Sequence, residues 1–105
     1  MVAWAPMIRH VVMWKLRGPS DEERRAQAEQ VRSALLALAG KIPGMSILEV
    51  GVALATDEQQ CDVVLSTTHD SWQALDVYQK HPEHQAVAQL IGALRSERRV
   101  VDFEA

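Results

Sequence analysis

The chain has 105 residues and a mass of 11.7 kDa, the size of a single domain. Its 48% hydrophobic and 24% charged residues are typical of a globular protein and exclude a disordered chain. A net charge of −3 provides no basic excess for a phosphate backbone, which argues against nucleic-acid binding. One cysteine cannot form an internal disulfide, and no apolar run reaches the roughly 20 residues that span a bilayer. We therefore expect a cytoplasmic protein without a membrane partner.

Residues 1–6 lack the charged and apolar regions of a signal peptide, so we expect a short extension followed by a domain over residues 7–105. Alternating apolar residues predict a first strand from Ile8 to Leu16. A helix is expected next, because Ser20 and Glu23 form a capping box. This helix is expected to run to about residue 39, where Gly40 ends it.

Two further strands are expected after a turn at residues 42–44. They run from Met45 to Leu54 and from Cys61 to Thr68, and the polar residues 56–60 join them as a hairpin. We interpret Cys61 as a small apolar residue at the start of its strand rather than a reactive thiol.

Two helices and a strand complete the predicted order. Asp70 or Ser71 caps the second helix, and Pro82 ends it. The third helix begins near Glu83, and apolar residues recur along it at helical spacing. The last strand is expected from Arg99 to Phe103.

The order β-α-β-β-α-α-β is a split βαβ repeat, which predicts an α+β fold with a four-stranded antiparallel sheet and helices on one face. The strands are apolar on both faces, because Val11 and Met13 alternate with Val12 and Trp14. An uncovered sheet face should be largely polar. We therefore predict a homodimer in which two copies pack sheet to sheet about a two-fold axis.

The segment from Tyr78 to His84 gathers three proton-transfer groups, the phenol and the imidazoles of His81 and His84, around Pro82. Histidine changes charge near neutral pH, so this cluster is a candidate acid–base site. His84 lies one turn before Val87 on the apolar stripe of the third helix, and we therefore expect its side chain to point inward.

Six motifs occur together along the chain: Met7–Leu16, Ile42-Pro43-Gly44, Glu49-Val50-Gly51, Asp62-Val63-Val64-Leu65, Tyr78-x-x-His81-Pro82-x-His84 and Val101-Asp102-Phe103. In combination they resemble the Dabb family, the stress-responsive α/β-barrel domain of the dimeric ferredoxin-like superfamily. The resemblance covers residues 7–104. It implies a ferredoxin-like protomer whose dimer closes an α/β barrel, with a cleft for a small ligand between sheet and helices. The biochemical activity of most such proteins is undefined.

The resemblance also implies roles for particular residues. In a plant member that cyclises a polyketide by intramolecular aldol condensation, the catalytic tyrosine and histidine match Tyr78 and His84. A pocket histidine of its first strand matches His10. An aldol step needs a base and a hydrogen-bond donor to the carbonyl, so His84 would be the base and Tyr78 the donor, without cofactor or metal. The other residues expected to line this pocket, for a small aromatic or polyketide-like ligand, are Trp14, Trp72 and His81.

A structural interpretation of the same residues stays open. In it the corner histidines only satisfy helix ends, Tyr78 is a core residue whose hydroxyl has a backbone partner, and the protein is stress-responsive without turnover. A metal site at His81, Glu83 and His84 is disfavoured, because three ligands within four residues rarely converge. A cofactor-free oxygenase would rest on fold analogy alone. His69, beside a helix cap, is expected at the surface.

Overall fold

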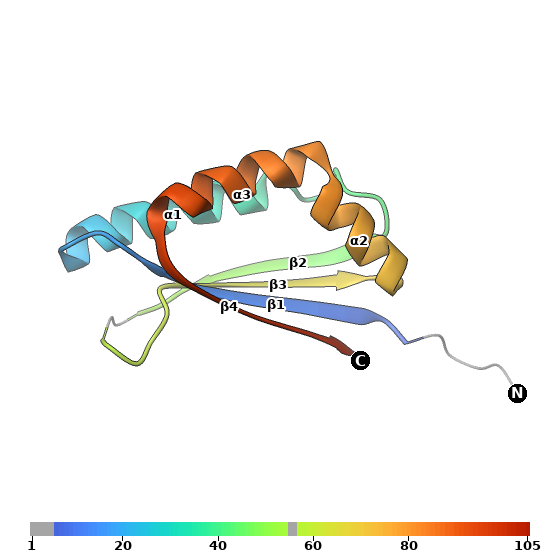
Figure 1. The fold of residues 1–105 in the computed structure, drawn as a ribbon, viewed down its shortest axis with the longest axis horizontal. Helices are drawn as coiled ribbons and strands as arrows, with labels where there is room; N and C mark the ends of the chain where they lie inside the picture. Colours follow the sequence, from blue (N-terminus) through green and yellow to red (C-terminus); the bar gives the residue numbers. More distant parts are fainter. Residues whose placement is uncertain (1–5, 55–56) are drawn as a thin grey trace, which may run out of the picture.

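The computed structural model describes residues 6–54 and 57–105. It has three helices on one face of a four-stranded sheet (Figure 1). In chain order the elements are β1 (Ile8–Leu16), α1 (Asp21–Leu36), β2 (Met45–Val52), β3 (Val63–His69), α2 (Trp72–Lys80), α3 (Pro82–Leu94) and β4 (Arg95–Glu104). The predicted order and fold class are confirmed. Residues 1–5 of the expected extension and residue 56 of the expected hairpin loop lie outside the described residues.

The sheet has the strand order β2-β3-β1-β4, and every neighbouring pair is antiparallel. β1 is therefore flanked by β3 on one side and β4 on the other. The register sets His10 opposite Thr67 of β3 and opposite Asp102 of β4. It also sets Trp14 opposite Arg98 of β4. This alignment brings polar groups from three strands to the helix-covered face of the sheet.

The strand β4 begins at Arg95, four residues before the expected start at Arg99. The polar segment between these residues gives no apolar alternation, and it therefore resembles a loop in sequence. In the structure, however, Arg95 already has the extended dihedral angles φ −84° and ψ 148°, so α3 passes directly into the strand. The early start places both Arg95 and Arg98 on the sheet.

The other boundaries differ by a few residues. β2 ends at Val52 and β3 begins at Val63, so Cys61 precedes its strand instead of starting it. α1 ends at Leu36, three residues before the expected end. Beyond it the chain forms tighter hydrogen bonds between residues three apart, as in a 3₁₀ turn, such as the one from the amide of Leu38 to the carbonyl of Leu35. This tighter turn buries Leu38 in the core.

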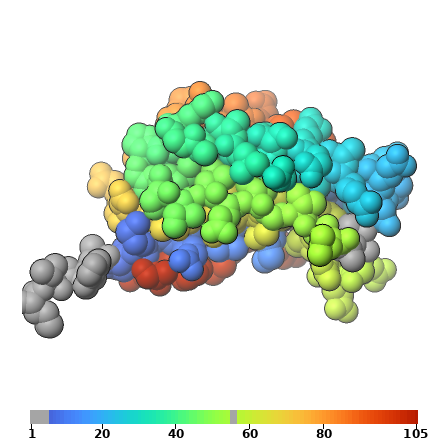
Figure 2. Space-filling view, turned by 180° about the vertical axis from the view of Figure 1, so that it is seen from behind, coloured from blue at the N-terminus to red at the C-terminus, as the bar shows by residue number. Residues whose placement is uncertain are grey.

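The core lies between the sheet and the helices, and the alternation of β1 supplies its centre. Ile8, Val12, Trp14 and Leu16 are all buried on the helix-covered face. α1 contributes Val31 and Leu35 from above the β2 edge of the sheet, the side seen in Figure 2. The opposite face of the sheet carries both polar and apolar residues, and the large apolar side chains exposed on it are Met13, Ile47, Val64, Val101 and Phe103. No helix in the described ranges is long and apolar enough to cross a membrane.

The turn before β2 requires a glycine. Gly44 has a φ of +76°, and a Cβ added there would come 2.8 Å from the Cβ of Ala74 on α2. Its carbonyl also accepts a 2.9 Å hydrogen bond from the amide of Asp70, which ties the turn to the entry of α2. Gly40 has a similar φ of +75°, but an added Cβ there meets no atom within 4 Å.

We predict that Gly44→Ala destabilises the protein more than Gly40→Ala does. Both changes impose the left-handed conformation on an L residue, which costs about 1–2 kcal/mol. Only Gly44→Ala adds a clash with α2, which should cost roughly 1–3 kcal/mol more. Urea unfolding monitored by circular dichroism measures the difference. Equal losses of stability for the two variants would contradict the close packing of this turn on α2.

Candidate functional site

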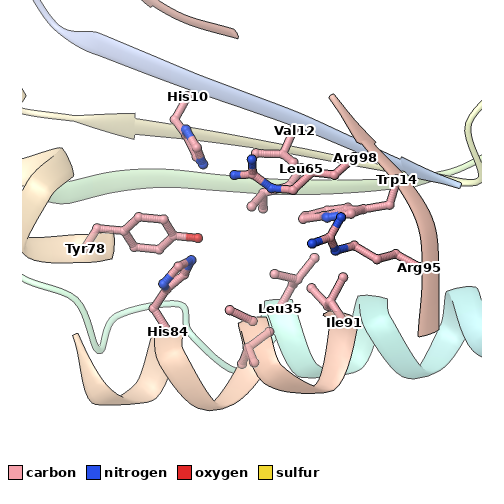
Figure 3. A pocket seen from close by; sticks show the side chains of 12 residues that line it. His10, Val12, Trp14, Leu35, Leu65, Tyr78, His84, Ile91, Arg95 and Arg98 are labelled. Atoms are coloured by element: carbon pink, nitrogen blue, oxygen red, sulfur yellow. The ribbon is translucent and has the colours of Figure 1, made fainter. Parts of the chain in front are cut away.

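A cavity of about 120 Å³ lies between the sheet and α3. β1, β3, all three helices and β4 contribute to its lining, which is apolar apart from one group of polar side chains (Figure 3). These polar residues are His10, Tyr78, His84, Arg95 and Arg98. Trp14, expected at the pocket wall, is among the apolar lining residues.

Tyr78 extends from the last turn of α2 with its hydroxyl directed into the cavity (Figure 3). Its side chain is 0% exposed, and the hydroxyl has no hydrogen-bond partner among the described residues. A buried polar group without a partner costs about 1–3 kcal/mol. Burial raises the pKa of Tyr78 to about 12, although the positive charge of Arg98 opposes the shift. The phenol therefore keeps its proton at neutral pH and can donate it to a ligand.

His84 faces Tyr78 from the first turn of α3, with the ring centroids 4.3 Å apart. Its Nδ1 lies 3.1 Å from the carbonyl oxygen of Gln79. Because a carbonyl can only accept, Nδ1 carries the proton and the lone pair lies on Nε2. Burial lowers the pKa of His84, partly offset by this hydrogen bond to Gln79. The imidazole is therefore favoured in its neutral form, which is the form that acts as a base.

The corner between α2 and α3 brings this pair together. His81 has φ −66° and ψ 135°, the extended conformation that a residue before proline adopts. Pro82 then occupies the first position of α3, where its missing N–H costs nothing. The ring Nδ1 of His81 accepts a 3.1 Å hydrogen bond from the amide of Glu83 and so caps α3. His81 does not line the cavity, contrary to the expectation from the sequence.

A second imidazole enters the cavity from the sheet. His10 on β1 is 2% exposed, and its Nδ1 lies 2.5 Å from Oδ1 of Asp102 on the neighbouring strand. With the carboxylate as acceptor, Nδ1 carries the proton and Nε2 is left for a ligand. The rings of His10 and Tyr78 meet edge to face with centroids 5.8 Å apart. Asp102 therefore fixes the orientation of an imidazole beside the phenol.

The prediction that His69 is a surface residue is wrong. β3 continues through His69, and the alternation of Leu65, Thr67 and His69 turns all three side chains toward the helices. His69 is 0% exposed, its Nε2 lies 2.8 Å from Oγ1 of Thr67, and its ring centroid lies 4.9 Å from that of Tyr78. Burial lowers the pKa of His69 to about 4, and His10 acts in the same direction. His69 is therefore a neutral side chain that packs against the Tyr78 ring.

Trp72 does not take the position expected from the sequence. It opens α2, is 49% exposed, and donates a 3.0 Å hydrogen bond from Nε1 to Oε1 of Glu104. It is not among the cavity-lining residues. The first residue of this short helix lies about two turns from Tyr78, so the two aromatic side chains extend from opposite ends of α2.

The sequence did not identify Arg95, Arg98 or Asp102 as site residues. All three lie on β4. Because the strand was predicted to start only at Arg99, Arg95 and Arg98 were not assigned to a face of the sheet. Extending the strand backwards puts Asp102, residue 100 and Arg98 on one face, because side chains alternate along a strand. Asp102 then lies beside His10, and Arg98 lies beside Trp14. Within the described ranges, no group of three or more histidine, cysteine or acidic residues is placed to hold a metal ion.

Residues 8–105 match the family model described as the stress responsive A/B barrel domain, Dabb. A dimeric ferredoxin-like protein of unknown function from Bacteroides fragilis is 28% identical, with a TM-score of 0.82 over 94% of this chain and 96% of that chain. Another from Thermobifida fusca is 26% identical, with a TM-score of 0.82 over 95% and 92%. A hydroxynitrile lyase from Passiflora edulis shares the fold at 14% identity, with a TM-score of 0.78 over 95% and 94%. No curated protein sequence matches the chain.

We predict that His69 makes the stability of the protein depend on pH between about 6.5 and 4. In the unfolded chain His69 takes up a proton near its ordinary pKa of 6.5, whereas in the folded protein its pKa is about 4. Stability should therefore fall as the pH drops through this window, by about 3 kcal/mol from this residue. Urea unfolding at several pH values should show a shallower decline for His69→Gln. Parallel declines for both proteins would contradict a buried, neutral His69.

Proposed function

The chain belongs to the Dabb family of stress-responsive A/B barrel domains. We propose that its cavity is a cofactor-independent acid–base site acting on a small carbonyl compound. One observation carries the proposal. The buried Tyr78 hydroxyl has no partner among the described residues, and it faces an imidazole whose hydrogen bond to Gln79 leaves Nε2 without the proton. A proton donor and a proton acceptor thus meet at one cavity wall.

The proposed reaction begins with removal of a proton next to a carbonyl group. Nε2 of His84 takes the proton, the C–H electron pair forms the carbon–carbon double bond, and the carbonyl π pair moves to oxygen. Tyr78 donates its O–H to that oxygen and stabilises the developing negative charge. The enolate carbon then adds to a second carbonyl carbon, as in an aldol condensation; the π pair of that carbonyl moves to its oxygen, which takes the proton from His84. Alternatively, the enolate carbon takes this proton back. The reverse addition cleaves a carbon–carbon bond.

His10 supplies a second polar group to the same cavity. The hydrogen bond from its Nδ1 to Asp102 fixes the ring, and Nε2 remains for contact with the substrate. The ring of His69 also packs against Tyr78, which holds the phenol in place. Preorganised groups in a poorly hydrated site stabilise charge more effectively than water does, because they need not reorient during the reaction.

The size of the cavity supports a small substrate. Its volume of about 120 Å³ is well below the roughly 300 Å³ at which pockets for drug-sized ligands begin. A polyketide-like cyclisation needs more space than this cavity offers, so we propose a shorter carbonyl compound instead. The Passiflora hydroxynitrile lyase supports lyase chemistry on this fold, but at 14% identity it carries no substrate over to this chain.

We predict that the protein accelerates exchange of the protons next to the carbonyl of small ketones in D₂O. Loss of the base in His84→Gln should slow this exchange by about 10²–10⁴-fold, and Tyr78→Phe should also slow it. Trp72→Phe is the matched aromatic control, because Trp72 is exposed and does not line the cavity. Proton NMR measures the exchange rates.

Two outcomes would contradict the proposed activity. If no ketone exchanges faster with the protein than without it, the site does not abstract protons. If His84→Gln exchanges as fast as the unmodified protein, His84 is not the base. Shifts of the His84 ring resonances on ketone addition, without any exchange, would indicate a ligand-binding protein that performs no reaction.

We further propose that the chain forms a two-fold dimer through the uncovered face of its sheet. This face exposes the large apolar side chains of Met13, Val64, Val101 and Phe103. Sheets pack about 10 Å apart when apolar faces meet, which would remove these side chains from water. The related proteins from Bacteroides fragilis and Thermobifida fusca are dimeric, which supports the same assembly here.

We predict that Val11→Glu disrupts this dimer. Val11 lies opposite Val101 of β4 in the middle of the uncovered face, so two-fold symmetry would bury two carboxylates in the interface. Analytical ultracentrifugation at micromolar concentration should give twice the 11.7 kDa protomer mass for the unmodified chain and about the protomer mass for the variant. Ser33→Glu adds the same charge to the exposed side of α1 and should remain dimeric. Dimers for both variants would contradict sheet-to-sheet packing.

We also propose a cytoplasmic location and a role in the stress response. The single cysteine, which cannot form an internal disulfide, supports the location. The family name supports the role, without indicating a particular signal. Residues 1–6 precede the region that matches the family, and we propose that they form an extension to a domain over residues 7–105.

A further inference from the structure

Two arginines line the cavity from the strand β4. Arg95 and Arg98 both contribute to its wall, and their guanidinium groups are turned into the space between the sheet and α3 (Figure 3). Arg98 is exposed, whereas Arg95 is half-buried beside Trp14 and Ile91. The acid–base chemistry proposed above uses neither of them.

Neither guanidinium group has a counter-ion among the described residues. The ion pairs of the described residues do not include Arg95 or Arg98. Their backbone carbonyls accept hydrogen bonds from the side chains of Arg17 and Arg99, and neither guanidinium group donates a hydrogen bond to another described residue. No carboxylate of the described ranges lines the cavity. The nearest acid on the same face of β4 is Asp102, whose carboxylate is occupied by His10. The cavity therefore carries uncompensated positive charge at one end.

This charge acts on the acid–base pair. Burial raises the pKa of Tyr78 and lowers the pKa of His84. The positive charge of Arg98 opposes the first shift and adds to the second, so its field reaches the cavity wall where the two side chains meet. Apolar walls such as Trp14 and Leu65 strengthen such a field, because they lower the local dielectric constant. An anion that entered the cavity would satisfy the guanidinium groups and would lie beside the phenol.

We propose that the cavity binds a short-chain oxo acid, with its carboxylate on Arg98 and Arg95 and its carbonyl group between Tyr78 and His84. This assignment rests on the proposed acid–base function and names its substrate class. The planar guanidinium fork matches a carboxylate with two parallel hydrogen bonds, which fixes the orientation of the acid as well as its position. The cavity volume of about 120 Å³ limits the chain to a short one.

The arginines also have a chemical consequence for such a substrate. Removing a proton next to the carbonyl of an oxo acid places a second negative charge on a molecule that already carries one. Like charges within a few ångströms repel, and this repulsion raises the barrier to enolate formation. A guanidinium on the carboxylate cancels the first charge before the second develops. Arg98 therefore favours the reacting state as well as binding.

The test is a calorimetric titration with 2-oxobutanoate, 3-oxobutanoate and 4-oxopentanoate, each compared with its uncharged methyl ester. The three acids place the carbonyl at increasing distances from the carboxylate, so the tightest one reports the spacing between the arginines and Tyr78. Arg98→Gln should weaken the best acid by about 10- to 100-fold, as expected for loss of a charge-assisted pair. Arg98→Lys keeps the charge but loses the planar guanidinium fork. Its affinity for the acid should therefore lie between those of the unmodified protein and of Arg98→Gln.

Matched controls identify the source of the effect. Arg32→Gln removes the same charge from the exposed side of α1, where Arg32 pairs with Glu29, and should leave affinity for the acid unchanged. The methyl esters should bind equally to the unmodified protein and to Arg98→Gln. Arg95→Gln tests the second guanidinium, and it should also weaken the acid without affecting the ester.

Different results overturn different parts of the account. If acid and ester bind with equal affinity, or if Arg98→Gln leaves the acid unaffected, the oxo-acid assignment is wrong, while ketone exchange that depends on His84 would still support the acid–base site. If the acid binds through Arg98 but shows no exchange of its protons in D₂O, the proposed function fails and the anion site stands. If inorganic phosphate displaces the acid at equal concentration, the cavity recognises small anions in general and the carboxylate assignment is overturned.

Discussion

The register of β1 between its two neighbours is the constraint on which the site depends. It turns His10 and Trp14 toward the helices, sets Asp102 and Arg98 opposite them on β4, and sets Thr67 opposite His10 on β3. A slip of one residue would turn this entire set to the other face. The core-facing apolar residues of β1 oppose such a slip, because Ile8, Val12 and Leu16 would lose their burial in the core. Core packing and site geometry are thus fixed by the same pairing.

The second requirement is the corner at Pro82. Tyr78 and His84 are separated by six residues, and a continuous helix would place them on different sides of its axis. The extended conformation of His81 turns the chain, so that the end of α2 and the start of α3 present both rings to the sheet at a centroid distance of 4.3 Å. The corner therefore agrees in part with both the structural and the catalytic interpretation of the sequence. His81 caps α3, while Tyr78 and His84 line the cavity. Capping accounts for His81 but leaves the Tyr78 hydroxyl without a partner in the described part of the chain.

Periodicity predicted most of the fold, because alternation in β1 and helical spacing in α3 are properties of the sequence itself. It failed where an element lacks apolar residues. The start of β4 is polar, so Arg95 and Arg98 were not assigned to the sheet. His69 was missed for a related reason, since its alternation with Leu65 and Thr67 becomes visible only when β3 is extended by one residue. The contact of His10 with Asp102 joins residues that are far apart in the chain, and only the strand pairing determines it.

The proposed function requires Tyr78 and His84 to form a hydrogen-bond donor and a proton acceptor prepared for a carbonyl ligand. The tautomer of His84 tests it most directly, because the hydrogen bond to Gln79 requires the proton on Nδ1. Long-range ¹H–¹⁵N NMR correlations of the histidine rings at neutral pH distinguish the two neutral tautomers and the charged form. We expect a neutral His84 with the proton on Nδ1 and an Nε2 resonance that shifts when a small ketone or oxo acid is added. A proton on Nε2, or a charged His84 at neutral pH, would contradict it.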